Sequence, residues 1–198
     1  MAWSERLWQS LRFEYVGQGG LAEQAEQQAR KALRQVSRLC HEDLLTALEQ
    51  RRIKMTVHDS WLRADSNITI STLSSETTWL HEILHNVESE LVVGGQLGQQ
   101  PLVPVGSVWR DVRSKDMTVT QRLSSLTGNR AYGADEVAVV DDWSHAYVGK
   151  IYPYSRSSEV VSMGADQMHD LWGSPSESDR KQVAFVLSIL QGRYRLPK

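Results

Sequence analysis

The sequence predicts an α+β fold in which amphipathic helices flank a small mixed sheet. Long stretches repeat apolar residues every third or fourth position, which is the spacing of one helix face. Shorter stretches between them alternate apolar and polar residues, which is the spacing of a strand. The chain has 198 residues, of which 40% are hydrophobic and 23% charged, as in an ordinary globular domain. We therefore expect an N-terminal helical segment, residues 1–50, packed on a core domain, residues 51–198.

The first quarter of the chain is mainly helical by this criterion. Residues 1–18 are short and amphipathic and lead into a glycine-rich turn. From 21 to about 50, apolar residues recur at steps of three and four, and the opposite face is rich in Gln, Glu and Arg. This pattern predicts one long helix, or two helices broken near Cys40 and His41. Such a helix usually belongs to the scaffold of a domain.

The remainder of the chain alternates between the two patterns. Alternating apolar and polar residues predict a strand over 53–58, and the sequence also reads as strands over 67–72, 136–140 and 147–152. Helical spacing predicts helices over 76–93, 119–126, 157–171 and 176–190. Residues 94–118 have little periodicity and predict a long loop.

The helix that follows the second of these strands carries the sequence HEILH at residues 81–85. Positions i and i+4 of a helix lie ~40° apart around the axis and ~6 Å apart along it. His81 and His85 can therefore bind one metal ion from the same face. Glu82 lies beside them and can act as general base toward a metal-bound water. This is the HExxH arrangement of zinc metallopeptidases.

The residues around the motif predict a capped, half-buried helix. Ser74 or Ser75 is the candidate N-cap, and Glu76 would interact favourably with the helix dipole. Gly94 and Gly95 end the pattern. The apolar face consists of Trp79, Leu80, Ile83, Leu84 and Val87. The alternative interpretation is a helix with two surface histidines that bind no metal.

Catalytic zinc needs a third protein ligand, and we favour Glu159 for it. Glu159 opens the helix after the strand 147–152, so its carboxylate can face a metal held by a crossing helix. Gly164, one turn later, would permit this helix to approach the HExxH helix closely. Glu88 lies ~10 Å along the axis from His81, too far to bind the same ion, so we expect it to support a ligand or cap a helix. The alternative third ligands are His145, Asp142, Asp166 and His169, and the alternative role of Glu159 is a carboxylate at a helix N-terminus.

Zn²⁺ is the expected cofactor, because two imidazoles and one carboxylate suit it best among common divalent ions. Bound zinc lowers the pKa of its water from 15.7 to about 7, and a further donor is needed to stabilise the oxyanion. Candidates for oxyanion or substrate contacts are Tyr147, Tyr152 and His145, which lie close to Glu159 in the sequence.

Three segments occur in a characteristic order: the HExxH helix, DDWSHAYVGKIY at residues 141–152, and SEVVSMG at 158–164. Together they resemble the zincin-like domains of bacteriophage head-morphogenesis proteins and of related prophage- or toxin-associated chains. The resemblance covers residues 75–192. It implies a zincin-like fold and a gluzincin-type site, in which Glu159 is the third ligand beside the two histidines and Glu82 is the catalytic base.

These patterns lead us to expect a zinc-dependent metallopeptidase that hydrolyses peptide bonds in a protein or peptide substrate. The resemblance adds a phage or prophage protein as a candidate partner. The first alternative is a catalytically silent zincin-fold module with a structural or interaction role. The second alternative is a helical domain in which the HExxH sequence is accidental.

Composition argues against several other classes of protein. The net charge is −2 without a long basic run, so nucleic-acid binding is not expected. No stretch of ~18 apolar residues is present, so no membrane span is expected. Cys40 is the only cysteine, which rules out an internal disulfide, and the first residues lack an apolar signal core. We therefore expect a cytoplasmic protein, with virion association as the alternative that the resemblance implies.

Overall fold

The computed structural model describes residues 1–17, 20–58, 68–71, 74–90, 119–141, 145–152, 158–169 and 177–193. Within them, helices accompany two small sheets, as the α+β class requires. The elements are, in order, α1 (Trp3–Ser10), β1 (Arg12–Val16), α2 (Ala22–Leu39), α3 (Glu42–Arg51), β2 (Lys54–His58), β3 (Ile68–Ser71), α4 (Glu76–Glu90), β4 (Thr120–Arg122), α6 (Leu123–Thr127), β5 (Val137–Val139), the 3-10 helix η1 (Ala146–Gly149), α7 (Val160–His169) and α8 (Glu177–Leu190).

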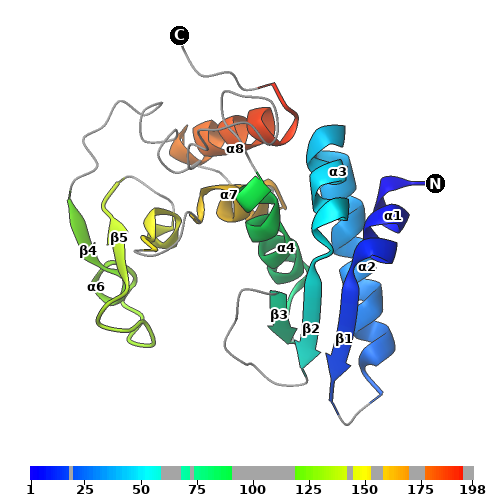
Figure 1. Ribbon diagram of the computed structural model, residues 1–198. Helices are drawn as coiled ribbons and strands as arrows, with labels where there is room; N and C mark the ends of the chain where they lie inside the picture. Colours follow the sequence, from blue (N-terminus) through cyan, green and yellow to red (C-terminus); the bar gives the residue numbers. More distant parts are fainter. Residues whose placement is uncertain are drawn as a thin grey trace.

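The larger sheet is parallel throughout, with strand order β1-β2-β3. Parallel strands need a long crossover connection between them. The crossover that joins β1 to β2 contains the helices α2 and α3. Figure 1 shows this sheet and α2 at one side of α4. The strands predicted over 53–58 and 67–72 are confirmed as β2 and β3. The single mixed sheet that we expected is instead two separate sheets in the described residues, because β4 pairs only with β5, in antiparallel fashion.

The strand β1 was missed by the periodicity argument. Its sequence, RFEYV, does alternate, and the residues on one side are exposed while Phe13 and Tyr15 are partly buried. It pairs with β2 from Arg12 opposite Lys54 to Val16 opposite His58. A strand from the first 50 residues therefore lies in the same sheet as β2 and β3.

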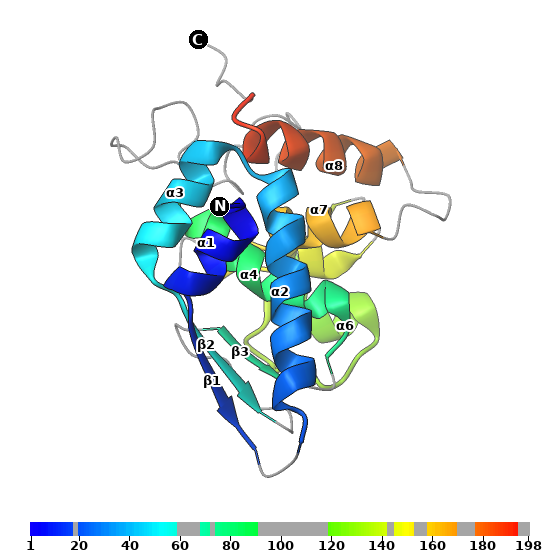
Figure 2. The same ribbon diagram turned by 90° about the vertical axis from the view of Figure 1, so that its right-hand side faces the viewer.

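The long helical stretch divides into two helices at the place where a break was expected. α2 ends at Leu39, and α3 begins at Glu42. His41 is the N-cap of α3, because its Nδ1 accepts a hydrogen bond of 3.4 Å from the backbone N–H of Asp43. Figure 2 shows α2 running past α4, with α1 and α3 beside it.

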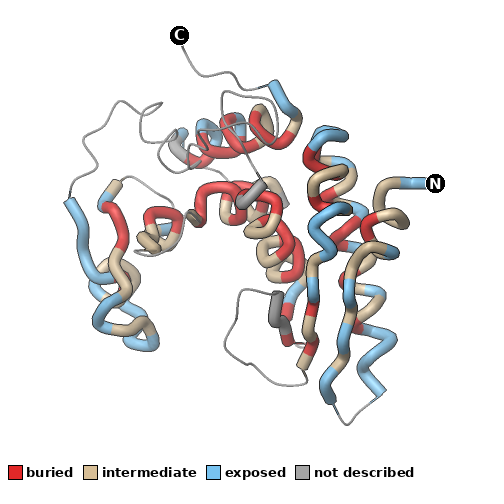
Figure 3. The backbone as a smooth tube through the Cα atoms, in the orientation of Figure 1, coloured by how far each residue is buried: buried red, intermediate tan, exposed pale blue. Residues whose placement is uncertain are grey.

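Helix α4 is the central element of the fold, packed between α2 and α7. Its predicted apolar face is confirmed: Trp79, Leu80, Ile83, Leu84 and Val87 are all buried. Ser75 is the N-cap, since its Oγ accepts a hydrogen bond of 3.2 Å from the backbone N–H of Thr78. In the first turn, the carboxylate of Glu76 accepts hydrogen bonds from Lys31 and Gln35 of α2. Figure 3 shows the buried residues concentrated where α4 meets its neighbours.

Two predicted elements differ from the structure. The helix predicted over 119–126 is a short strand, β4, followed by the one-turn helix α6, which Gly128 ends with a φ of 71°. The strand predicted over 147–152 is wrong: residues 146–149 form the 3-10 helix η1. Its amides bond locally, Val148 N–H to the carbonyl of His145 and Lys150 N–H to that of Tyr147. The loop predicted over 94–118 lies outside the described residues.

Gly164 makes its close approach to a different helix from the one that we expected. A Cβ atom at this position would lie 2.7 Å from Cγ2 of Val186, which belongs to α8 rather than to α4. Real Cβ atoms essentially never approach another heavy atom so closely. The absence of a side chain at Gly164 therefore allows α7 and α8 to pack against each other.

None of the described helices is both long and apolar enough to cross a membrane.

The contact between α7 and α8 predicts the effect of a methyl group at residue 164. Replacing a helical glycine by alanine ordinarily stabilises a protein by about 0.5–1 kcal/mol. Here Gly164→Ala should instead lower the free energy of unfolding by about 1–3 kcal/mol, because the new methyl group overpacks Val186. The measurement is urea denaturation. In a Val186→Ala background the loss should shrink, and an equal loss in both backgrounds would show that Val186 is not its cause.

Candidate metal centre

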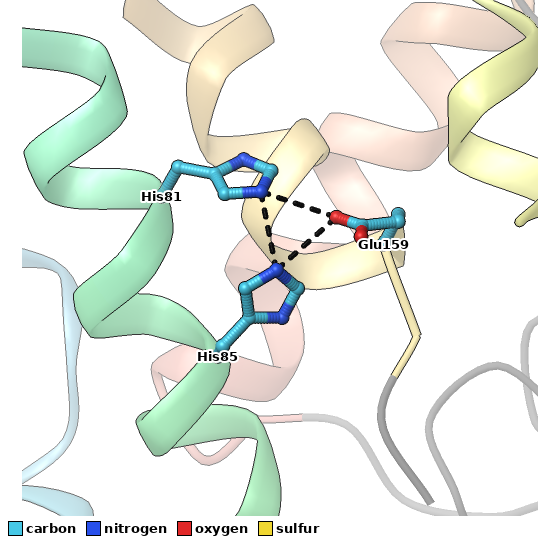
Figure 4. A group of neighbouring side chains, drawn as sticks. All are labelled: His81, His85 and Glu159. Atoms are coloured by element: carbon cyan, nitrogen blue, oxygen red, sulfur yellow. Dashed lines mark hydrogen bonds and ion pairs between the residues drawn. The ribbon is translucent and has the colours of Figure 1, made fainter. Parts of the chain in front are cut away.

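Two histidines of α4 and one glutamate at the start of α7 form a compact cluster (Figure 4). The Nε2 atoms of His81 and His85 lie 3.1 Å apart. Each lies 3.2 Å from the same carboxylate oxygen, Oε2 of Glu159. Among the described residues, these are the three that could hold a metal ion together. The structure thus brings together the residues that the sequence nominated as ligands.

The separations of these three atoms fit a zinc ion. Zinc binds imidazole nitrogen and carboxylate oxygen at about 2.0–2.2 Å, usually in tetrahedral geometry. Two ligands at such distances and at tetrahedral angles lie about 3.3–3.5 Å apart. The three distances of 3.1 to 3.2 Å are close to this separation. Three ligand atoms on one side of an ion leave one tetrahedral position open, as in catalytic zinc sites.

Glu159 is held in place on both sides of its carboxylate. It is fully buried, with a side-chain exposure of 0%. Its Oε2 accepts a hydrogen bond of 3.0 Å from the hydroxyl of Ser162, and its Oε1 accepts one from the hydroxyl of Tyr152. Its own carbonyl oxygen accepts a 3.0 Å bond from Met163 N–H, which begins the hydrogen bonding of α7. Both main chain and side chain are therefore fixed before any ion binds.

The outer nitrogen of His81 is bonded to an acidic residue of α7. Its Nδ1 lies 3.0 Å from Oδ2 of Asp166. Because a carboxylate can only accept, Nδ1 carries the hydrogen, and this leaves the lone pair of Nε2 free for a metal in the neutral tautomer. We had weighed Asp166 as a third ligand. The structure places it on the ring nitrogen that points away from the cluster, where it can orient the imidazole.

Glu88 connects the end of α4 to the start of α7. Its carboxylate accepts hydrogen bonds from both the hydroxyl and the backbone N–H of Ser158, the latter at 3.3 Å. It also lies 3.8 Å from Nδ1 of His85, which is too long for a hydrogen bond but close enough for electrostatic attraction. Glu88 therefore attracts the imidazole of His85. It also holds Ser158, the residue directly before Glu159.

Charge in the cluster is balanced between imidazoles and carboxylates. Burial alone would lower the pKa of His81 and of His85, but bonds and charge from Glu159, Asp166 and Glu88 outweigh burial and raise both. Burial would raise the pKa of Glu159, but the two imidazoles hold it well below its usual range. The buried carboxylate therefore needs positive charge beside it. Protons on the imidazoles supply this charge in the metal-free protein, and a bound cation would displace them.

Glu82 lies next to the cluster and is partly buried. Burial raises the pKa of its carboxyl above the usual value, although positive charge on His81 and His85 opposes the shift. The negative charges of Glu159 and Asp166 raise it further. A carboxylate acts best as a general base when its pKa approaches the working pH. The environment of Glu82 therefore suits the role that the sequence suggests for it.

The other nominated residues take different places. The hydroxyl of Tyr152 donates to Glu159, and that of Tyr147 accepts a 3.2 Å bond from Lys150. His145 is exposed and caps η1, its Nδ1 accepting a 3.3 Å bond from Tyr147 N–H. Asp142 and the side chain of His169 lie outside the described residues. As oxyanion or substrate contacts, Tyr147, Tyr152 and His145 remain predictions.

Sequence reasoning gave no role to two residues of this region. Ser162 lies three residues after Glu159, the spacing at which side chains of one helix face meet, and this signal could have identified it. Lys150 belongs to the segment 141–152. Its bond to the Tyr147 hydroxyl depends on the η1 turn, which the sequence did not predict.

The bond between Asp166 and His81 predicts a change in zinc affinity. Asp166→Asn keeps the size of the side chain but removes the charge that fixes the histidine tautomer. Loss of such a supporting partner typically weakens metal binding about 10- to 100-fold. Competition with a chromophoric chelator measures the dissociation constant for zinc. Asp43→Asn, on the exposed first turn of α3, is the matched control. Equal affinities of the parent and Asp166→Asn would contradict this role.

Comparison with known proteins adds no relative. No family model matches the chain, and no curated protein and no solved structure matches it significantly. The resemblance to zincin-like domains therefore stays a prediction from the sequence motifs.

Proposed function

We propose that the protein is a zinc-dependent metallopeptidase with a zincin-like fold. The observation that carries this proposal is the meeting of three ligand atoms, from His81, His85 and Glu159, at 3.1 to 3.2 Å from one another. Two of these residues lie one turn apart on a helix, and Glu82 lies between them. A site that only stabilises a fold needs no such base, so its presence favours hydrolysis over a silent module.

In the proposed reaction, each group of the chain has a separate task. A zinc ion held by His81, His85 and Glu159 would supply an activated water and a Lewis acid for the carbonyl of the scissile bond. Glu82 accepts a proton from the attacking water and passes it to the leaving amine. Asp166 keeps His81 in the tautomer that exposes Nε2. Ser162 and Tyr152 hold the carboxylate of Glu159 in place.

The class of substrate is a protein or peptide, which follows from the resemblance and from the HExxH arrangement. A phage or prophage partner and a cytoplasmic or virion location remain proposals that rest on the resemblance. The silent zincin-fold module remains the alternative. It predicts that the parent does not cleave peptides, so that exchanging Glu82 does not change cleavage.

Exchange of the proposed base should separate catalysis from metal binding. Glu82→Gln should bind zinc as the parent does but hydrolyse a mixed peptide library about 100- to 10,000-fold more slowly, the usual contribution of general base catalysis. Glu49→Gln, a glutamate of α3 that pairs with Arg6 of α1, is the matched control and should cleave as the parent does. The measurement is the appearance of new peptide termini by mass spectrometry. Cleavage by Glu82→Gln at the parent rate would refute the role of Glu82, and a parent that cleaves nothing would favour the silent module.

A further inference from the structure

The two oxygens of the Glu159 carboxylate have different partners. Oε2 faces both imidazoles, at 3.2 Å from each Nε2, and accepts a bond from Ser162. Oε1 accepts the hydroxyl hydrogen of Tyr152. The oxygen that lies at 3.2 Å from both imidazoles is therefore not the one that Tyr152 holds.

This asymmetry matters for the number of ligands around an ion. A carboxylate can bind a metal through one oxygen or through both. Binding through both oxygens of Glu159 would bring a fourth protein atom to the metal, in the region that a catalytic zinc site keeps for water or substrate. For Oε1 to bind as well, the carboxylate would have to turn toward the metal, which would draw Oε1 away from the Tyr152 hydroxyl and weaken a charge-assisted hydrogen bond.

The ring of Tyr152 is held by a neighbouring lysine. Lys150 donates a 3.2 Å bond to the hydroxyl oxygen of Tyr147, and its ammonium group also lies over the ring of Tyr152. The single hydrogen of the Tyr152 hydroxyl is donated to Oε1 of Glu159.

Lys150 is itself anchored by an ion pair. Its Nζ lies 2.8 Å from Oε1 of Glu136, and it lies about equally far from the ring centres of Tyr147 and Tyr152, at 4.8 and 4.9 Å. Contacts of an ammonium with aromatic faces are attractive at this range. The lysine thus holds the rings of both tyrosines.

We propose that Tyr152 is a positioning residue that restricts Glu159 to one-oxygen coordination and so keeps one coordination position of the metal open. Lys150, which lies over the ring of Tyr152, orients it for this task. This inference rests on the proposed metal centre. It adds that one particular hydrogen bond, from Tyr152 to Glu159, keeps the fourth coordination position open.

The test uses Co²⁺ in place of zinc, because its visible absorption is intense with four ligands and weaker with five. The parent should bind one Co²⁺ per chain and give the intense four-coordinate spectrum. Tyr152→Phe removes only the hydroxyl. It should still bind Co²⁺, but with an absorption several-fold weaker, as Oε1 joins the metal. Lys150→Met should move the spectrum in the same direction by a smaller amount.

Tyr132→Phe is the matched control, because it removes the hydroxyl of another tyrosine of this region, which stacks on Tyr147 at 5.9 Å between ring centres. It should leave the spectrum unchanged. If Tyr152→Phe does not fold, as judged by circular dichroism, Lys150→Met carries the test. An identical four-coordinate spectrum in the parent and in these two variants would overturn the inference and leave the metal centre intact. A parent that binds neither Co²⁺ nor Zn²⁺ would overturn the metal centre itself.

Discussion

The burial of one carboxylate is the constraint on which the rest of the structure depends. Glu159 is fully buried at the start of α7, and a buried negative charge is costly unless it is paired and hydrogen-bonded. Its partners come from three parts of the chain: the imidazoles of α4, Ser162 of α7 itself, and Tyr152 from the segment after η1. Satisfying this one group therefore fixes how the segments around it pack together.

The scaffold around this cluster is built so that α4 has little freedom. Its apolar residues are buried between α2 and α7, and Glu76 at its first turn is bonded to two side chains of α2. At its other end, Glu88 holds Ser158 just before α7. A metal site requires its ligands within a fraction of an ångström of their proper places, which rigid helices provide better than loops. The absence of a side chain at Gly164 lets α8 pack closely against α7.

Features that depend on local sequence could be predicted, and features that depend on distant contacts could not. The pairing of His81 with His85 follows from helix geometry, and the Ser75 cap and the break at His41 follow from residue preferences. Glu159 was the favoured third ligand, and its place in the fold separates it from the alternative Asp166, which bonds to His81 from 85 residues away. The strand β1 was missed because it is short and only partly buried. The turn η1 was mistaken for a strand because its backbone amides bond to carbonyls only three residues earlier, which the residue types do not reveal.

The central claim is that His81, His85 and Glu159 bind one zinc ion, and metal content tests it most directly. Elemental analysis of the purified protein, alongside His85→Ala and Glu159→Ala, should give about one zinc per chain in the parent and almost none in either variant. A parent without zinc even after zinc has been supplied would contradict the claim. So would variants that retain zinc at the level of the parent.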